Sequence, residues 1–238
     1  MESHVEFTLN KPSLYIDGKL TPPVIYALSD FPGARSNTYQ AYRNIKNFKD
    51  AGIHLVEVDT QLRLGWHKID PFDPEPMCED IAHALDGNPD AKIIVRLHLN
   101  PPYWWLRDHP EECVIYRTCD GDICGADNGE QERLIANDNL YHMRASLGSE
   151  LWKEEAGKLL KEFIESIKGT PVGDSVAAIQ VAGGMFGEWH HWSEGHAADV
   201  SAPMQNHFKS FLKEKYITEE NLQKAWHMPN VTFENAVY

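Results

Sequence analysis

Short apolar runs alternate with amphipathic helical patterns along most of this chain, and this alternation limits the fold more than any other feature. The apolar runs, each typical of a buried strand, are residues 24–28, 53–58, 92–99 and 177–182. Helical patterns separate them at about 38–51, 75–85 and 149–168. We expect the first helix to bury the stripe of Tyr39, Tyr42, Ile45 and Phe48. Strands joined by helices form right-handed crossovers and a parallel sheet, which leaves two α/β folds, a doubly wound sheet or a (β/α) barrel.

Polar residues at the ends of these strands favour the barrel. Asp59 ends the second strand, the third ends in Arg96, His98 and Asn100, and Glu188 follows the fourth. Barrel active sites form at this carboxyl-terminal face from several strand ends. No glycine-rich nucleotide fingerprint follows any strand, so the sequence predicts a TIM-type (β/α) barrel and no cofactor.

The number of strands is too small for a complete barrel. About four are used by residue 182, the rest of the chain offers at most one or two more, and a full barrel has eight. We therefore expect residues 1–238 to form one domain holding about the first half to two-thirds of a barrel, with a long insertion at about 107–148. Such a piece has two open sheet edges and an uncovered apolar interior, so it needs either a homo-oligomer or the missing C-terminal half.

The charge of the chain narrows the class of ligand. With 36 acidic and 22 basic residues, the net charge of −14 argues against nucleic acid and against an anionic membrane as partners. Seven Trp and nine Tyr suit the faces of sugar rings, although most Trp residues pack in cores. No apolar run approaches the ~20 residues of a membrane span, and no signal segment is evident. The expected location is the cytoplasm, or an extracellular or periplasmic one if a signal was removed.

Two groups of residues raise the question of a metal, and neither has a diagnostic spacing. Cys113, Cys119 and Cys124 lie close together but form no C-x-x-C pair, so free thiols are expected, Cys78 included. A second group does not match the H-E-x-x-H pattern of metal hydrolases and consists of Glu188, His190, His191, Glu194 and His196. No metal site is predicted.

Glu188 is the leading catalytic candidate. The apolar run before it ends in glycines and brings its carboxyl into a cluster of Trp and His. A carboxyl among aromatic rings is poorly solvated when ionised, so its pKa rises and it can donate a proton near neutral pH. The alternative is a solvated loop glutamate.

Two segments carry a resemblance to a known family. The run from Pro101 through Tyr103, Trp104, Trp105 and Leu106, with Pro110 and Glu111 after it, is similar to the proline-tryptophan signature of the family 42 glycoside hydrolases, which are β-galactosidase-like retaining (β/α) barrels. The tail from Phe208 to Trp226 resembles the segment after that family's fourth strand. The likeness covers most of the chain.

This resemblance implies a retaining glycosidase that acts on β-linked sugars. Its acid/base glutamate ends strand four, here Glu188, and its nucleophile ends strand seven, outside this chain; Glu57 and Asp59 are weak substitutes. The clan usually has Asn before the acid, where this chain has Gly187, so Glu194 is the alternative acid.

Further residues are candidates for binding the substrate, with packing or strand-end structure as the alternative role of each. They are Asp59, Arg96, His98, Asn100, Trp104, Trp105, Trp189 and His190. The alternative to an enzyme is a non-catalytic carbohydrate-binding barrel.

Overall fold

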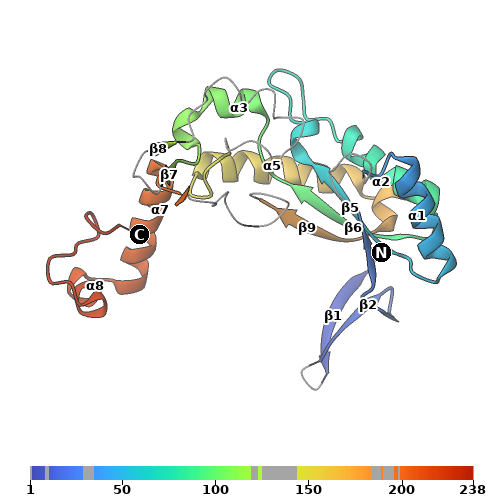
Figure 1. The fold of residues 1–238 in the computed structure, drawn as a ribbon, viewed down its shortest axis with the longest axis horizontal. Helices are drawn as coiled ribbons and strands as arrows, with labels where there is room; N and C mark the ends of the chain where they lie inside the picture. The colour runs from blue at the N-terminus through green and yellow to red at the C-terminus, as the bar shows by residue number, and fades with distance from the viewer. Residues whose placement is uncertain are drawn as a thin grey trace.

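A four-stranded parallel sheet forms the centre of the protein (Figure 1). This computed structural model describes residues 2–8, 11–28, 35–118, 123–124, 144–183, 189, 196–197 and 199–237. The strands lie in the order β4 (Ile25–Ala27), β5 (Leu55–Gln61), β6 (Lys92–His98) and β9 (Val176–Ala182). Every neighbouring pair is parallel, and helices connect the strands, which confirms the predicted α/β organisation.

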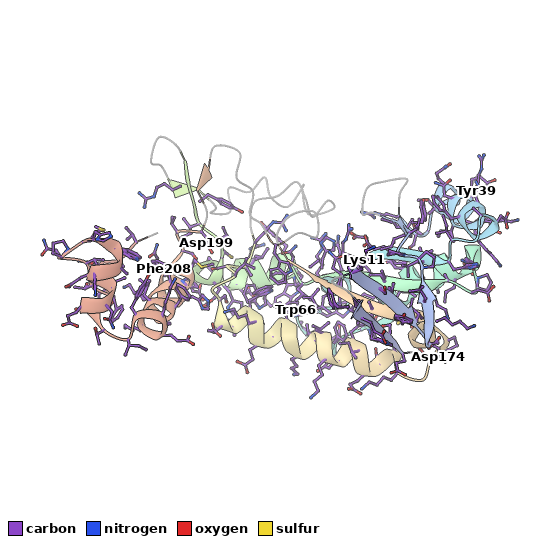
Figure 2. All side chains as sticks on the ribbon, turned by 90° about the horizontal axis from the view of Figure 1, so that it is seen from below. Lys11, Tyr39, Trp66, Asp174, Asp199 and Phe208 are labelled. Atoms are coloured by element: carbon purple, nitrogen blue, oxygen red, sulfur yellow. The ribbon has the colours of Figure 1, made fainter. Side chains whose placement is uncertain are left out.

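Three longer helices pack on one face of this sheet: α1 (Tyr39–Asp50), α2 (Glu75–Gly87) and α5 (Glu150–Ile167). Figure 2 shows α5 running along one side of the molecule toward Asp174. The helices begin where the sequence provides capping groups, because the Thr38 hydroxyl accepts from the Ala41 amide and the Ser149 hydroxyl accepts from the Trp152 amide. Their apolar faces cover the sheet and form the main core.

That core uses alternate residues of the strands. Val56 and Val58 of β5 and Val95 of β6 are fully buried and pack in one cluster with side chains of the helices, which include Ile45, Met77, Ile81, Trp152 and Phe163. Tyr39 and Tyr42 are exposed, so the predicted stripe of α1 is wrong at these two positions. The buried residues of α1 are Ala41 and Ile45.

The opposite face of the sheet would be the interior of a barrel. The amino-terminal part of this face carries Ile25, Leu55 and Ile94, but its carboxyl-terminal part carries polar side chains, which are Glu57, Asp59, Gln61, Arg96, His98 and Gln180. The expectation of an apolar interior is therefore wrong for the upper half of this face. Strand residues alternate between faces, and here the alternation directs the polar ones inward.

The N-terminal segment forms a separate antiparallel sheet of β1 (Ser3–Thr8), β2 (Lys11–Ile16) and β3 (Lys19–Thr21), which projects from the body in Figure 1. Asp17 and Gly18 both have positive φ, as the tight turn between β2 and β3 requires. The Ser3 hydroxyl donates to the carbonyl of Ala177 and so ties β1 to the start of β9.

The segment after β6 contains α3 (Tyr103–Asp108), the short helix η2 (Pro110–Glu112), and the strands β7 (Tyr116–Thr118) and β8 (Ile123–Cys124). A further strand, β10 (His196–Ala197), pairs with β7. Cys119 and the side chain of Cys124 lie outside the described residues.

Asp199 holds these segments together. Its buried carboxylate accepts from the backbone amides of Ile115 and Ser201, at 3.1 and 3.0 Å, and from the Ser146 hydroxyl at 2.5 Å. Ser201 also caps α7, so one carboxylate joins the strand region, the segment before α5 and the start of the C-terminal helices.

The chain ends in α7 (Ala202–Tyr216) and α8 (Glu219–Trp226), at the far end of the molecule from α1 (Figure 1). These helices have a small core of their own around Leu212, Leu222 and Phe233. Thr218 caps α8, since its hydroxyl accepts from the Asn221 amide. Other short helices are η1 (Leu62–Leu64) and α6 (Pro171–Ser175). Within the described part of the chain, no helix has the length and apolar composition to cross a membrane.

Candidate functional site

The candidate site lies where β5, β6 and β9 reach their carboxyl ends. Asp59 is paired in register with Arg96, and Arg96 with Gln180, so their side chains share the inner face. Gln61 and His98 form the next pair along the same strands. The pleat therefore concentrates the polar residues of separate strands into one cluster at the edge where barrel active sites form.

Arg96 is at the centre of this cluster. Its Nη2 pairs with Oε1 of Glu57, and its Nη1 lies 3.4 Å from Oδ2 of Asp59. His98 donates from Nε2 to the same Asp59 oxygen over 3.1 Å. The side chains of Asp59 and His98 are only 3% and 1% exposed, whereas that of Arg96 is 23% exposed. The Arg96 guanidinium thus joins two buried carboxylates and is itself partly open to solvent.

The electrostatics of the two carboxylates differ. Burial raises the pKa of Glu57, and the nearby Arg96 guanidinium opposes this rise without cancelling it. Asp59 accepts hydrogen bonds only at Oδ2, and its Oδ1 is buried with no partner among the residues that the structure describes. A buried acceptor without a donor is costly, so Oδ1 is suited to accept a hydroxyl of a ligand.

Three of the predicted binding residues, Asp59, Arg96 and His98, therefore lie in direct contact. Asn100 is buried just beyond β6. The sequence had suggested Glu57 only as a weak nucleophile candidate, and Gln61 and Gln180 were missed. The period-two pattern of Glu57, Asp59 and Gln61 was the signal that could have identified Gln61.

The two adjacent tryptophans have different environments. Trp105 is fully buried in the main core, where its indole N–H donates to Oε2 of Glu155. This position leaves no surface on which a sugar could stack, and we do not retain Trp105 as a binding residue. Trp104 is half-buried, donates from Nε1 to the carbonyl of Trp66, and has Lys68 Nζ 5.9 Å from its ring centroid.

Trp189 is an exposed aromatic residue that contacts the end of β9. Its indole N–H donates to the carbonyl of Val181 at 3.0 Å, and the residue is 55% exposed. A Cβ at Gly183 would lie 2.8 Å from Cζ3 of Trp189, so the glycine allows the ring to lie against the backbone. The ring is thus anchored and still offers a free surface.

Several predicted residues lie outside the described part of the chain: Gly187, Glu188, His190, His191 and Glu194. Within the described part, no group of three or more His, Cys, Asp or Glu side chains is arranged to hold a metal ion.

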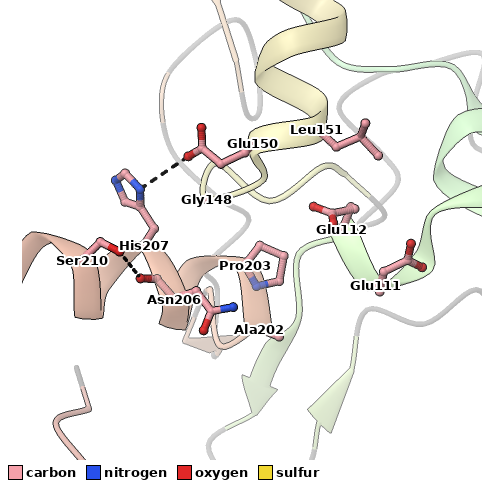
Figure 3. Close-up of a pocket in the computed structure, with 10 residues that line it drawn as sticks. All are labelled: Glu111, Glu112, Gly148, Glu150, Leu151, Ala202, Pro203, Asn206, His207 and Ser210. Atoms are coloured by element: carbon pink, nitrogen blue, oxygen red, sulfur yellow. Dashed lines mark hydrogen bonds and ion pairs between the residues drawn. The ribbon is translucent and has the colours of Figure 1, made fainter. Parts of the chain in front are cut away.

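A separate pocket of about 530 Å³ lies between η2, the start of α5 and α7 (Figure 3). Its carboxylates are those of Glu111, Glu112 and Glu150, and Glu150 lies 3.9 Å from Nδ1 of His207. None of its lining residues comes from the four-stranded sheet. This pocket therefore has no residue in common with the strand-end cluster.

Comparisons with known proteins define the fold. The structure is similar to the β-galactosidase of the psychrophilic Marinomonas ef1, with a TM-score of 0.55 and 19% sequence identity over 90% of this chain and 29% of that one. It is also similar to the catalytic domain of the β-amylase of Paenibacillus polymyxa, with a TM-score of 0.55 and 15% identity over 90% of this chain and 53% of that one.

The chain spans about a third of the first of these proteins and about half of the second. No protein-family model matches the sequence, and no curated protein is significantly similar to it. The likeness, together with the four parallel strands and their helices, confirms the predicted fold class, which is part of a TIM-type (β/α) barrel.

Proposed function

We propose that this chain is part of a glycoside hydrolase that acts on β-linked sugars in a β-galactosidase-like manner. The observation that carries the proposal is the cluster of Glu57, Asp59, Arg96 and His98 at the carboxyl ends of two barrel strands. The two similar structures, a β-galactosidase and a β-amylase, support carbohydrate chemistry on this fold. The proline-tryptophan resemblance to family 42 supports the β-galactosidase-like form.

In this proposal the strand-end cluster binds the sugar next to the bond that breaks. Asp59 Oδ1 accepts a sugar hydroxyl, while Arg96 and His98 fix the carboxylate from its other oxygen. Glu188 acts as the acid/base, and the nucleophile is supplied from outside this chain. Retaining hydrolysis needs the two carboxyls about 5 to 5.5 Å apart, so both must reach the same sugar.

The first experiment measures hydrolysis of a panel of nitrophenyl glycosides, including the galactoside. It compares the 238-residue chain, alone and joined to any strands that complete the barrel, with its Glu188→Gln and Asp59→Asn variants. We expect the complete protein to turn over a β-glycoside, Glu188→Gln to abolish turnover of unactivated substrates, and Asp59→Asn to raise KM. Undiminished turnover in Glu188→Gln would remove Glu188 from the mechanism.

The second candidate function is a non-catalytic carbohydrate-binding barrel. It is favoured by Arg96, which contacts both described carboxylates of the inner face and leaves neither as an unpaired nucleophile. The exposed, anchored ring of Trp189 also suits binding without chemistry. This candidate predicts saccharide-dependent changes in Trp fluorescence with no hydrolysis by the complete protein.

A further inference from the structure

A cavity of about 630 Å³ lies beside the carboxyl end of β5. Its walls come from four places: the segment before α1, residues 59–64 with η1, the first turns of α2, and the start of α3. It shares Asp59 and Gln61 with the strand-end cluster and includes no other residue of that cluster. The volume is in the usual range for a small-molecule site. The cavity is therefore contiguous with the proposed sugar site and extends away from it.

Hydrogen bonds to one carboxylate join three of the walls. Asp80 on α2 accepts from the Thr60 hydroxyl at 2.6 Å and from the Ser36 hydroxyl at 3.3 Å. Burial raises the pKa of Asp80, and the hydrogen bonds from Thr60 and Ser36 oppose this rise. The side-chain carbonyl of Gln61 accepts from Nε of Arg63 at 2.6 Å, which joins two of the lining residues.

Among the described lining residues, Asp59 has a buried, unsatisfied acceptor. Its side chain is 3% exposed, it lines the cavity, and its Oδ1 has no hydrogen-bond partner in the described ranges. Oδ2 is already bound by Arg96 and His98, so the free acceptor is at the junction of the cavity and the cluster. A hydroxyl donor placed there would satisfy it.

The lining favours a neutral, hydroxyl-rich ligand over an anion. Two arginines, Arg35 and Arg63, are offset by the carboxyls of Asp59, Glu79 and Asp80. Asn37 adds an amide, and Tyr103 adds an aromatic ring on the wall formed by α3. Hydroxyls of a sugar both donate and accept, and they need this mixture of partners.

We propose that this cavity is a second sugar-binding subsite, next to the one at Arg96 and His98, and that the ligand is an oligosaccharide of at least two units. The inference rests on the proposed carbohydrate function and specifies its substrate. Asp59 contacts hydroxyls of both sugars, Asn37 and Glu79 bind the second sugar from the outer rim, and Tyr103 lies along its ring.

The test is calorimetric binding of two sugar series to the full chain. One series is galactose, β-1,4-galactobiose and β-1,4-galactotriose, and the other is glucose, maltose and maltotriose. In one of them we expect about a tenfold gain in affinity from the monosaccharide to the disaccharide. Asn37→Ala and Glu79→Ala should remove this gain and leave monosaccharide affinity within about twofold. Both residues are exposed, so these variants should fold, and Asp86→Ala, at an exposed position of α2 outside the cavity, is the matched control.

The outcomes separate the two proposals. Equal affinity of the wild-type chain for mono- and disaccharides would overturn the second subsite and leave the carbohydrate function supported. A gain that persists in both rim variants would place the second sugar elsewhere and also overturn it. No binding of any sugar would overturn the carbohydrate function and the subsite together.

Discussion

Replacing Arg96 by Met tests whether this residue holds the inner-face cluster together. The change leaves Glu57 and Asp59 without their shared cation, while their side chains are only 9% and 3% exposed. Removing one partner of a buried ion pair typically costs 3–5 kcal/mol. Because Arg96 itself is 23% exposed and water can enter its place, we expect a loss near the lower limit, about 3 kcal/mol at pH 8.

The loss should depend on pH, and its direction follows from the carboxyls. Burial and repulsion from Asp59 raise the pKa of Glu57, and Arg96→Met removes the cation that opposes this rise. A carboxyl with a raised pKa stabilises the fold in its protonated form, and this contribution is lost as pH rises from the unfolded pKa through the folded one. Each unit of pKa rise costs about 1.4 kcal/mol above that range. The variant should therefore be less destabilised at pH 5 than at pH 8.

The assay is urea unfolding followed by Trp fluorescence at both pH values. Glu57→Gln combined with Arg96→Met should recover part of the stability at pH 8, because one of the two buried charges is removed. Lys158→Met is the control, since its pair with Glu162 is exposed and should be worth less than about 0.5 kcal/mol. A loss in Arg96→Met that is equal at pH 5 and pH 8 would refute this account of the cluster.

Three other predictions follow from contacts outside the cluster. Asp199→Ala should lower the free energy of unfolding by about 3–5 kcal/mol in urea titrations, because two buried donors and the half-buried amide of Ile115 lose their acceptor; a change below ~1 kcal/mol would contradict the bridging role. Burial raises the pKa of Cys113 to about 12, so this thiol should resist maleimide labelling at pH 8 until the chain unfolds, as peptide mass spectrometry can check. Trp189→Ala should weaken saccharide binding about tenfold in calorimetry with little loss of stability, and unchanged affinity would remove Trp189 from the sugar site.

The sequence predicted the central strands and most helices well because the hydrophobic pattern repeats over long segments and because helix caps depend only on residues close in the sequence. Ser149 and Thr218 mark helix starts by a hydroxyl that reaches an amide three residues on, and this needs no tertiary contact. The buried face of α1 was harder to predict. Tyr39 and Tyr42 have the apolar bulk of core residues, but the sheet and α2 select the face of Ala41 and Ile45.

Part of the candidate site could be predicted from the sequence, namely the residues at the strand ends. Asp59, Arg96 and His98 were identified because strand ends in a parallel sheet meet at one edge. Trp104 and Trp105 could not be separated, since neighbours on a helix point about 100° apart and only the packed structure decides which faces the core. The cavity beside β5 was also beyond sequence reasoning, because its walls come from four segments that are distant along the chain.

The outer edge of β9 has a consequence for how this sheet meets other chains. Ala182 directs its carbonyl toward β6, where it accepts from the Leu99 amide, so the carbonyl of Val181 points away from the sheet, and the carbonyl of Ala177 lies at the register shift between β6 and β9. The Ser3 hydroxyl and the Trp189 indole occupy these two acceptors. An incoming strand would have to displace both, which protects an edge otherwise suited to uncontrolled strand addition. Any strand that does pair there must release Trp189, so the fluorescence of this indole would report the event.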